Sequence, residues 1–428
     1  MSNDPAMNTP DSPEIDYTGW QRRIVLFLGG QSLSMFGSSL VQYAIMWYLV
    51  LTTDSGMMMT IYVLVGFLPH VVVSPFAGVW ADRFRRKRII MLADACIAMV
   101  TLVLAFIFMA GYQSVWLLLL VSLIRSLGGG IQAPAVSAVL PQLVPQDKLM
   151  RVNGINGSLQ SFIFILSPAA GGVILTMSSI TTAFFVDVVT ALIGVGILAT
   201  IAIPTHAKAL SGEKVGYLSD LKEGLLYVKK SGYIMELLVF YAILCLFMAP
   251  AALLAPLFVT RAFGGEVWML TVIEIVYSVG SIFGGLAIAA WGGFRNRTLT
   301  IGLATVCFGL LSAVLGIAPG FTLFALIMAV IGVSMPFANS PLMVILQERI
   351  APDMLGRVFS LISIVGAGFV PLGMLIFGPL ADVVDIRLLF IVSGLAMALL
   401  GALIYANRNL RNAGEPVAPP PPPAPAPE

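Results

Sequence analysis

The feature that most constrains this chain is its series of long apolar runs. Runs of roughly 20 to 25 residues match a helix that crosses a hydrocarbon core of about 30 Å at about 1.5 Å per residue. Of the 428 residues, 59% are hydrophobic and only 10% are charged, which leaves too little polar surface for a soluble domain. We therefore predict an all-α integral membrane protein, because the strands of a membrane barrel alternate in segments of about ten residues.

Hydropathy predicts twelve membrane spans, with boundaries good to a few residues. The expected spans cover residues 24–51, 57–81, 89–110, 115–140, 152–177, 181–203, 234–259, 267–290, 299–317, 322–346, 355–381 and 388–406.

The distribution of lysine and arginine orients these spans. With the N-terminus inside, 20 of the 23 cations fall on the inner side, only Arg261 and Arg387 fall outside, and Arg125 lies within a span. Cytoplasmic loops are enriched in lysine and arginine, so we expect both termini in the cytoplasm.

An internal duplication is visible at an offset near 206 residues. Gln142 corresponds to Glu348, Arg151 to Arg357 and Gly172 to Gly378. Six spans separate the copies, an even number, so the two copies have the same orientation. We predict two parallel six-helix halves with a pathway between them, as alternating access requires.

This organisation divides the chain into five parts. We expect a disordered cytoplasmic arm at 1–20, an N-terminal bundle at 21–203, a cytoplasmic linker with an amphipathic helix at 204–232, a C-terminal bundle at 233–408 and a disordered, proline-rich tail at 409–428.

Four stretches carry a resemblance to a known family. They are GVWADRFRRKR (78–88), SPAAGG (167–172), PQLVPQDKLMRVNG (141–154) and DLKEGLLYVKK (220–230). Through them the chain resembles the major facilitator superfamily, and within it the macrolide-efflux type of drug:proton antiporter.

The resemblance implies a charged latch between the halves on the inner side. The loop resembles the family pattern G-x-x-x-D-R-x-x-R, and departs from it at Arg85, where glycine is common. Its acid is expected near the N-terminus of the eleventh span, where the helix dipole favours an anion. The expected latch residues are Gly78, Asp82, Arg83, Arg86 and Asp94.

The stretch SPAAGG resembles the antiporter motif G-P-x-x-G-G of the fifth span, with serine in place of the first glycine. Proline removes a helix donor and small residues allow a close approach of another helix, so we expect a bendable, tightly packed gate. The alternative is an ordinary small-residue packing face. The motif residues are Ser167, Pro168, Gly171 and Gly172.

Ionisable groups at membrane depth are expensive, and few are present. Arg125 matches the family's R-x-x-x-G pattern; because its guanidinium does not deprotonate, we expect it to act on a nearby acid or to hold an anion. Glu274 and Asp187 are candidates for the acid that carries a proton, and we favour Glu274. Glu236 faces the cavity or extends towards the membrane surface.

Aromatic and methionine side chains adapt to many ligand shapes, so a cavity for large amphipathic compounds is expected to use them. The expected lining residues are Phe36, Tyr43, Trp47, Phe240, Phe247, Met248 and Met335.

These features predict a secondary active exporter of amphipathic drugs or natural products by proton antiport, not an enzyme. A siderophore-like exporter or a solute:proton symporter of the same fold is the alternative. No Walker A sequence, paired-histidine motif or G-x-S-x-G elbow occurs, which disfavours ATP use and a membrane enzyme. We expect no metal or bound cofactor, with sodium open as an alternative coupling ion, and a monomer in the lipid bilayer with no nucleic-acid partner.

Overall fold

The structure is a computed structural model that describes residues 19–203, 217–352 and 354–415. The side chains of residues 79, 82, 83 and 217–221 also lie outside the described part. Within these limits the chain is helical and contains no strand.

Six long helices form the first half of the molecule, here the N half: α1 (Trp20–Thr53), α2 (Gly56–Arg83), α3 (Arg86–Met109), α4 (Val115–Leu143), α5 (Leu149–Met177) and α6 (Ile180–Thr200), with a short 3-10 turn, η1 (Gln146–Lys148), before α5. The second half, here the C half, contains α8 (Gly232–Leu253), α9 (Ala255–Phe263), α10 (Val267–Trp291), α11 (Arg297–Leu315), α12 (Phe321–Arg349), α13 (Leu355–Val383), α14 (Ile386–Ala406) and α15 (Arg408–Ala413). The linker helix α7 (Tyr217–Lys230) connects them.

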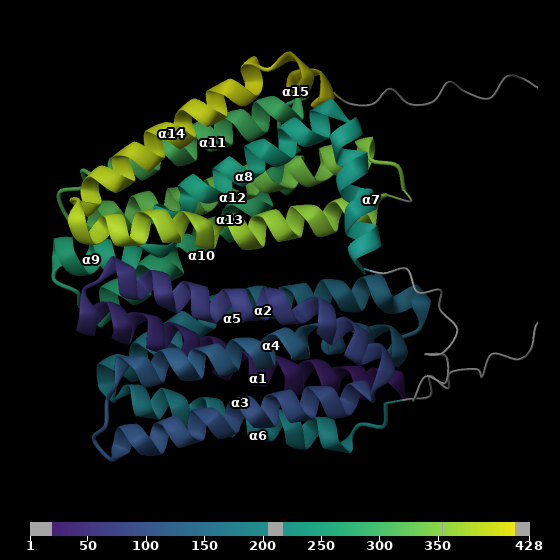
Figure 1. Cartoon of the computed structure of the whole chain (residues 1–428), viewed down its shortest axis with the longest axis vertical. Coiled ribbons are helices and arrows are strands. Elements are labelled where there is room, and N and C mark those ends of the chain that lie inside the picture. The colour runs from purple at the N-terminus through teal and green to yellow at the C-terminus, as the bar shows by residue number, and fades with distance from the viewer. Residues whose placement is uncertain (1–18, 204–216, 353, 416–428) are drawn as a thin grey trace, which may run out of the picture.

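Twelve helical segments of the described chain are long and apolar enough to cross a membrane, which confirms the predicted count. The two halves are separate bundles, with the N half coloured from purple to teal and the C half from teal through green to yellow (Figure 1). Both described chain ends lie at the same end of the bundles, which we call the termini side; the opposite end is the far side.

The predicted seventh span, 234–259, is two helices rather than one. Helix α8 ends at Leu253 and α9 begins at Ala255, with Pro256 in its first turn. Proline has no N–H for an uninterrupted helix but is well accommodated in a first turn, so the break falls just before it.

The same helix pairs pack together in both halves, as a duplication requires. Helix α2 packs on α4 as α10 packs on α12, α3 on α6 as α11 on α14, and α1 on α5 as α8 on α13. The fold is therefore two parallel copies of one six-helix unit.

Two close contacts join the halves near the far side. A Cβ added to Gly172 of α5 would lie 1.9 Å from Thr271 Oγ1 of α10, and one added to Gly378 of α13 would lie 1.7 Å from Thr60 Oγ1 of α2. Gly172 and Gly378 correspond in the duplication, so the two contacts are copies of each other. Small residues of this kind let membrane helices approach closely, since lipid gives little hydrophobic drive for association.

The halves separate towards the termini side. The first part of α5, from Arg151 to Ser161, is largely exposed, and so is the last part of α10. The structure is thus closed at the far side and open at the termini side.

The linker helix α7 packs on the C half. Glu223 pairs with Arg357 of α13 at 3.2 Å, and Tyr227 accepts a hydrogen bond from the backbone N–H of Ala351. Val228 is fully buried, whereas Leu225, expected on the same apolar face, is exposed.

Replacing Gly378 by alanine will loosen the far side, because the new methyl group has no room beside Thr60. We expect amide exchange at the start of α2 to rise at least about tenfold, measured by hydrogen–deuterium exchange and mass spectrometry. Gly285→Ala is the matched control, because a Cβ there meets nothing within 4 Å. Equal exchange in the two variants would show that this contact does not hold the halves together.

Candidate functional site

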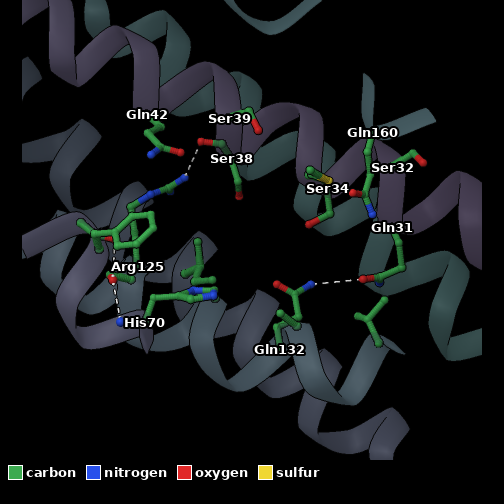
Figure 2. Close-up of a pocket in the computed structure, with 18 of the residues that line it drawn as sticks. Gln31, Ser32, Ser34, Ser38, Ser39, Gln42, His70, Arg125, Gln132 and Gln160 are labelled. Carbon is green, nitrogen blue, oxygen red and sulfur yellow. Dashed lines mark hydrogen bonds between the residues drawn. The ribbon is translucent and has the colours of Figure 1, made fainter. Parts of the chain in front are cut away.

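A cavity of about 570 Å³ lies within the N half. Its wall comes from α1, α2, α4 and α5, with Ile97 from α3, and it extends from the middle of the bundle towards the termini side. The wall is rich in amide and hydroxyl groups, and Figure 2 shows many of them around the cavity. The polar lining residues are Gln31, Ser32, Ser34, Ser38, Ser39, Gln42, His70, Ser122, Arg125, Ser126, Gln132, Ser137, Asn156 and Gln160.

Helix periodicity places these polar groups on the cavity. On α1, Gln31, Ser34, Ser38 and Gln42 are three or four residues apart, which is one face of a helix. A polar stripe in an apolar span needs hydrogen-bonding partners or water, so α1 turns this face inward.

Arg125 of α4 forms the central ion pair of the N half. Its guanidinium binds Asp187 of α6 and Thr101 of α3, and its second terminal nitrogen donates to the Ser38 carbonyl at 3.3 Å. Asp187 is fully buried and also accepts from Ser38 Oγ at 3.2 Å. Arg125 and Asp187, predicted separately, are thus one unit in which each charge is compensated and hydrogen-bonded, as a buried pair requires.

The guanidinium also borders the cavity. The Arg125 side chain is 10% exposed, and that part faces the cavity wall. With Asp187 beneath it, Arg125 can donate hydrogen bonds to a carbonyl, hydroxyl or ether oxygen of a ligand without adding an uncompensated charge.

Glu274 of α10 lies at the junction of the two halves. Tyr43 of α1 and Tyr277 of α10 are its electrostatic neighbours, and among the described residues it forms no ion pair or hydrogen bond. It sits one helical turn from Thr271, which contacts Gly172. A carboxyl without a counter-charge at membrane depth, between two moving bodies, is suited to carrying a proton.

The motif Ser167 to Gly172 packs α5 against α1 and α10. Ser167 and Pro168 are buried, and Ser167 Oγ donates to the Phe36 carbonyl at 3.4 Å. A Cβ on Gly171 would lie 3.7 Å from the Trp47 ring. The motif therefore lies where α5 meets both halves, close to Glu274.

Two expected site residues lie elsewhere. Glu236 accepts hydrogen bonds from Asn407 and Asn409 at 2.8 and 2.9 Å, so it fixes the end of the C half and does not reach the cavity. Asp94 was expected in the latch, but it is buried behind the cavity wall, where it accepts from Ser34 and Gln132. It lies too far along α3 from the loop cations to join them.

The expected aromatic lining also differs from the structure, because none of its seven residues borders the cavity. Trp47 and Phe240 are buried in the core, and the tilted ring of Tyr43 packs on Trp47 with 5.7 Å between ring centroids. The others pack against the core clusters. Large apolar rings gain more from packing between helices than from a polar cavity. The four other residues are Phe36, Phe247, Met248 and Met335.

Two contacts of Arg86, one of the expected latch residues, lie within the N half. Arg86 donates to the carbonyls of Ala81 and Ala138, at 3.0 and 2.7 Å, within the N half. A Cβ on Gly78 would meet nothing within 4 Å, because the halves diverge on this side. The side chains of Asp82 and Arg83 lie outside the described residues.

A polar cluster on the far side joins the two halves. We call this cluster the far-side clasp. Asp382, at the end of α13, accepts from the backbone N–H groups of Gly56 and Met57 at 2.6 and 2.9 Å and from Ser55 Oγ at 2.8 Å. Arg261 of α9 binds both Asp382 and Asp54 at 3.0 Å. An anion at the first turn of α2 satisfies free N–H groups and the helix dipole together.

The clasp has a signature in the sequence that we did not use. Gly378-Pro-Leu-Ala-Asp382 ends α13 as Gly78-Val-Trp-Ala-Asp82 ends α2. The polar stripe of α1 was likewise readable from its spacing. Arg261 and Asp54 gave no comparable pattern.

Comparison with known proteins now identifies the family. The profile of the Major Facilitator Superfamily matches residues 24–369. The chain belongs to the major facilitator superfamily. Macrolide efflux protein A of Streptococcus pyogenes is 30% identical over 380 residues, covering 88% of this chain and 94% of that protein, which makes this transporter one of the macrolide-efflux type. Multidrug efflux pump Tap of Mycobacterium bovis is 25% identical over 394 residues, covering 88% and 91%.

Solved structures show the same fold. A bacterial homologue of the iron transporter ferroportin in an inward-facing state has a TM-score of 0.68 at 15% identity, covering 90% of this chain and 98% of that one. The peptide transporter PepTSo has a TM-score of 0.69 at 12% identity, covering 92% and 98%.

Replacing Asp187 by asparagine will destabilise the transporter, because Arg125 is left as a buried cation without its anion. Breaking a buried pair costs roughly 3–5 kcal/mol, so we expect the apparent Tm to fall by roughly 5 to 10 °C. Buried Cys245 can report unfolding to a thiol-reactive dye once exposed Cys96 and Cys307 are alanine. Asp147→Asn, at an exposed acid, is the control; an equal Tm in both variants would contradict a structural role for the pair.

Replacing Asp382 by asparagine will open the far side, because α2 and Arg261 lose their shared anion. A loss of about 1–2 kcal/mol, typical of a helix cap, shifts the balance of closed and open forms roughly 5- to 30-fold. Spin labels at exposed Tyr112 and Ile317 will report a longer distance by electron–electron resonance. Asp385→Asn is the matched control, since Asp385 caps only its own helix α14. Identical distance distributions would rule out the clasp as a determinant of the closed far side.

Proposed function

We propose that this transporter exports amphipathic drugs or natural products of the macrolide kind from the bacterial cytoplasm, by alternating access in exchange for protons. The observation that carries the proposal is the 30% identity to a macrolide efflux protein over nearly the whole of both chains. The similarity to a multidrug efflux pump supports the same direction of transport.

The cavity supports a ligand of drug size. Sites of roughly 300–1,000 Å³ hold drug-sized molecules, and the cavity of about 570 Å³ falls within this range. Its many amide and hydroxyl groups suit a ligand with several oxygen acceptors and hydroxyl donors, and Arg125 supplies a fixed cationic donor in the wall.

The arrangement of charge supports proton coupling. Asp187 is neutralised by Arg125, whereas Glu274 has no cation partner in the described chain and lies between the halves. When the halves move, the surroundings of Glu274 change, whereas Asp187 keeps its cation Arg125 within the N half. Glu274 therefore takes the proton from one side and releases it on the other.

The cation distribution supports an orientation with the termini side in the cytoplasm of the bacterial cell. In this orientation the structure is open to the cytoplasm and closed outside by the far-side clasp. It is the state that receives substrate for export. Opening the clasp and closing the termini side would release the substrate outside.

Replacing Glu274 by glutamine tests the proton carrier, because glutamine keeps the shape of the side chain but cannot bind a proton. In proteoliposomes with an imposed pH gradient, we expect accumulation of a labelled macrolide to fall at least about tenfold, while exchange of labelled for unlabelled macrolide without a gradient persists. Glu236→Gln is the control, since Glu236 bonds only to the asparagines near α15.

Three outcomes would contradict this scheme. Full accumulation of macrolide by the Glu274→Gln variant under a pH gradient would show that another acid carries the proton. Accumulation by the unaltered transporter that survives collapse of the proton gradient would refute antiport, and accumulation of a siderophore but no macrolide would refute the substrate class.

A further inference from the structure

Asp94 is a buried acid that the export scheme does not use. It lies on α3, eight residues from the start of the helix, or about 12 Å along it. Only 2% of the residue is exposed. Among the described residues it forms no ion pair with a lysine or arginine, in contrast to Asp187.

The two oxygens of Asp94 have different surroundings. Oδ1 accepts from Ser34 Oγ at 2.9 Å and from Gln132 Nε2 at 2.8 Å. Oδ2 is buried and has no hydrogen-bond partner. A neutral carboxylic acid fits these surroundings better than a carboxylate, because its Oδ2–H leaves one donor unmet but buries no charge. A buried carboxylate would instead need donors at both oxygens.

The carboxylate form of Asp94 needs a hydrogen-bond donor at Oδ2, and a suitable donor lies nearby. Gln31 of α1 lies beside Asp94, and its Nε2 is also buried without a partner. Its Oε1 accepts from Gln132 Nε2 at 3.2 Å, the contact drawn in Figure 2. A rotation of the Gln31 amide would supply Oδ2 with a donor, so Ser34, Gln132 and Gln31 would then surround the carboxylate.

The cage around Asp94 has a path to water. Gln31, Ser34 and Gln132 all border the cavity, so a proton released from Oδ2 passes through the polar wall into it. At the depth of Asp94 the neighbouring charged or titratable groups are Arg125 and Asp187, which pair with each other, and His70 on α2 at the cavity wall. The other cations of α1 and α3 lie in the first turns of these helices: Arg22, Arg23, Arg86, Lys87 and Arg88. The Gln31 rotation can therefore set the charge of Asp94 without help from a mobile cation.

We propose that Asp94, with Gln31, Gln132 and Ser34, is a second proton-binding site, so that the transporter exchanges two protons for each substrate molecule. This inference rests on proton antiport as the proposed function. One proton binds at Glu274 between the halves and the other at Asp94 Oδ2 inside the N half. Each step is only the binding or release of a proton, which comes from the membrane gradient.

The coupling ratio can be measured directly. In proteoliposomes held at zero membrane potential, with a pH difference of one unit, two protons sustain a substrate gradient of about 100-fold and one proton about tenfold. We expect about 100-fold for the unaltered transporter with a labelled macrolide, and about tenfold for Asp94→Asn, which keeps the acceptor for Ser34 and Gln132. Asp385→Asn, outside the cavity, should keep about 100-fold.

The outcomes separate this inference from the proposed function. A gradient of about 100-fold in Asp94→Asn, or about tenfold in the unaltered transporter, overturns the second site and leaves antiport standing. A substrate gradient that does not depend on the pH difference overturns antiport itself. A substrate gradient that depends on a sodium gradient instead would make both acids sodium sites, and it also overturns the proposal.

A second measurement serves if Asp94→Asn folds but does not transport. The infrared difference spectrum between acidic and alkaline buffer should contain the carbonyl band of a buried carboxylic acid in the Glu274→Gln background. Adding Asp94→Asn should remove that band. A band that persists in the double variant overturns the proposal without reference to transport.

Discussion

The cost of placing a charge in hydrocarbon determines the arrangement of this transporter. Arg125 and Asp187 meet this cost by pairing, and Thr101 and Ser38 complete their hydrogen bonds. The pair ties α3, α4 and α6 to α1 within one half, so it moves as a unit. Asp94 and Glu274 lack a cation in the described chain, so we propose that a bound proton neutralises each of them in place of a counter-ion. The presence or absence of a partner separates the structural charges from those that can carry protons.

The two copies of the six-helix unit differ in their buried charged residues. Both halves keep the same helix pairings and the same glycine–threonine contact at their junction. At the repeat offset of 206, however, Arg125 corresponds to Ile331 and Asp187 to Ser393, both buried. The C half therefore replaces the ion pair by apolar packing, which explains why the cavity lies within the N half. The C half contributes Glu274 at the junction and a large, continuous core.

Hydropathy was sufficient to predict the helices, because a membrane span is a local property of about twenty residues. Charged groups at membrane depth were also easy to find. Their partners were not, since Arg125 and Asp187 are 62 residues apart and meet only in the packed bundle. The expected aromatic residues do not border the cavity of the N half, because an aromatic ring in a membrane helix fits lipid, core and cavity equally well. Glutamine and serine side chains at membrane depth need hydrogen-bonding partners or water, so the polar stripe from Gln31 to Gln42 indicates the cavity wall more directly.

The clasp explains how such a structure can alternate without a large stored energy. Asp382 caps α2 on the far side with backbone N–H groups that any residues would supply. A matching pattern, Gly78 to Asp82, occurs at the other end of α2, and we propose that this expected latch caps α13 once the termini side closes. Each closed form would then gain one capped helix and lose the other, which keeps the two forms within a few kcal/mol. Substrate and protons can shift so small a difference, whereas a deep apolar seal on one side would hold the transporter in a single state.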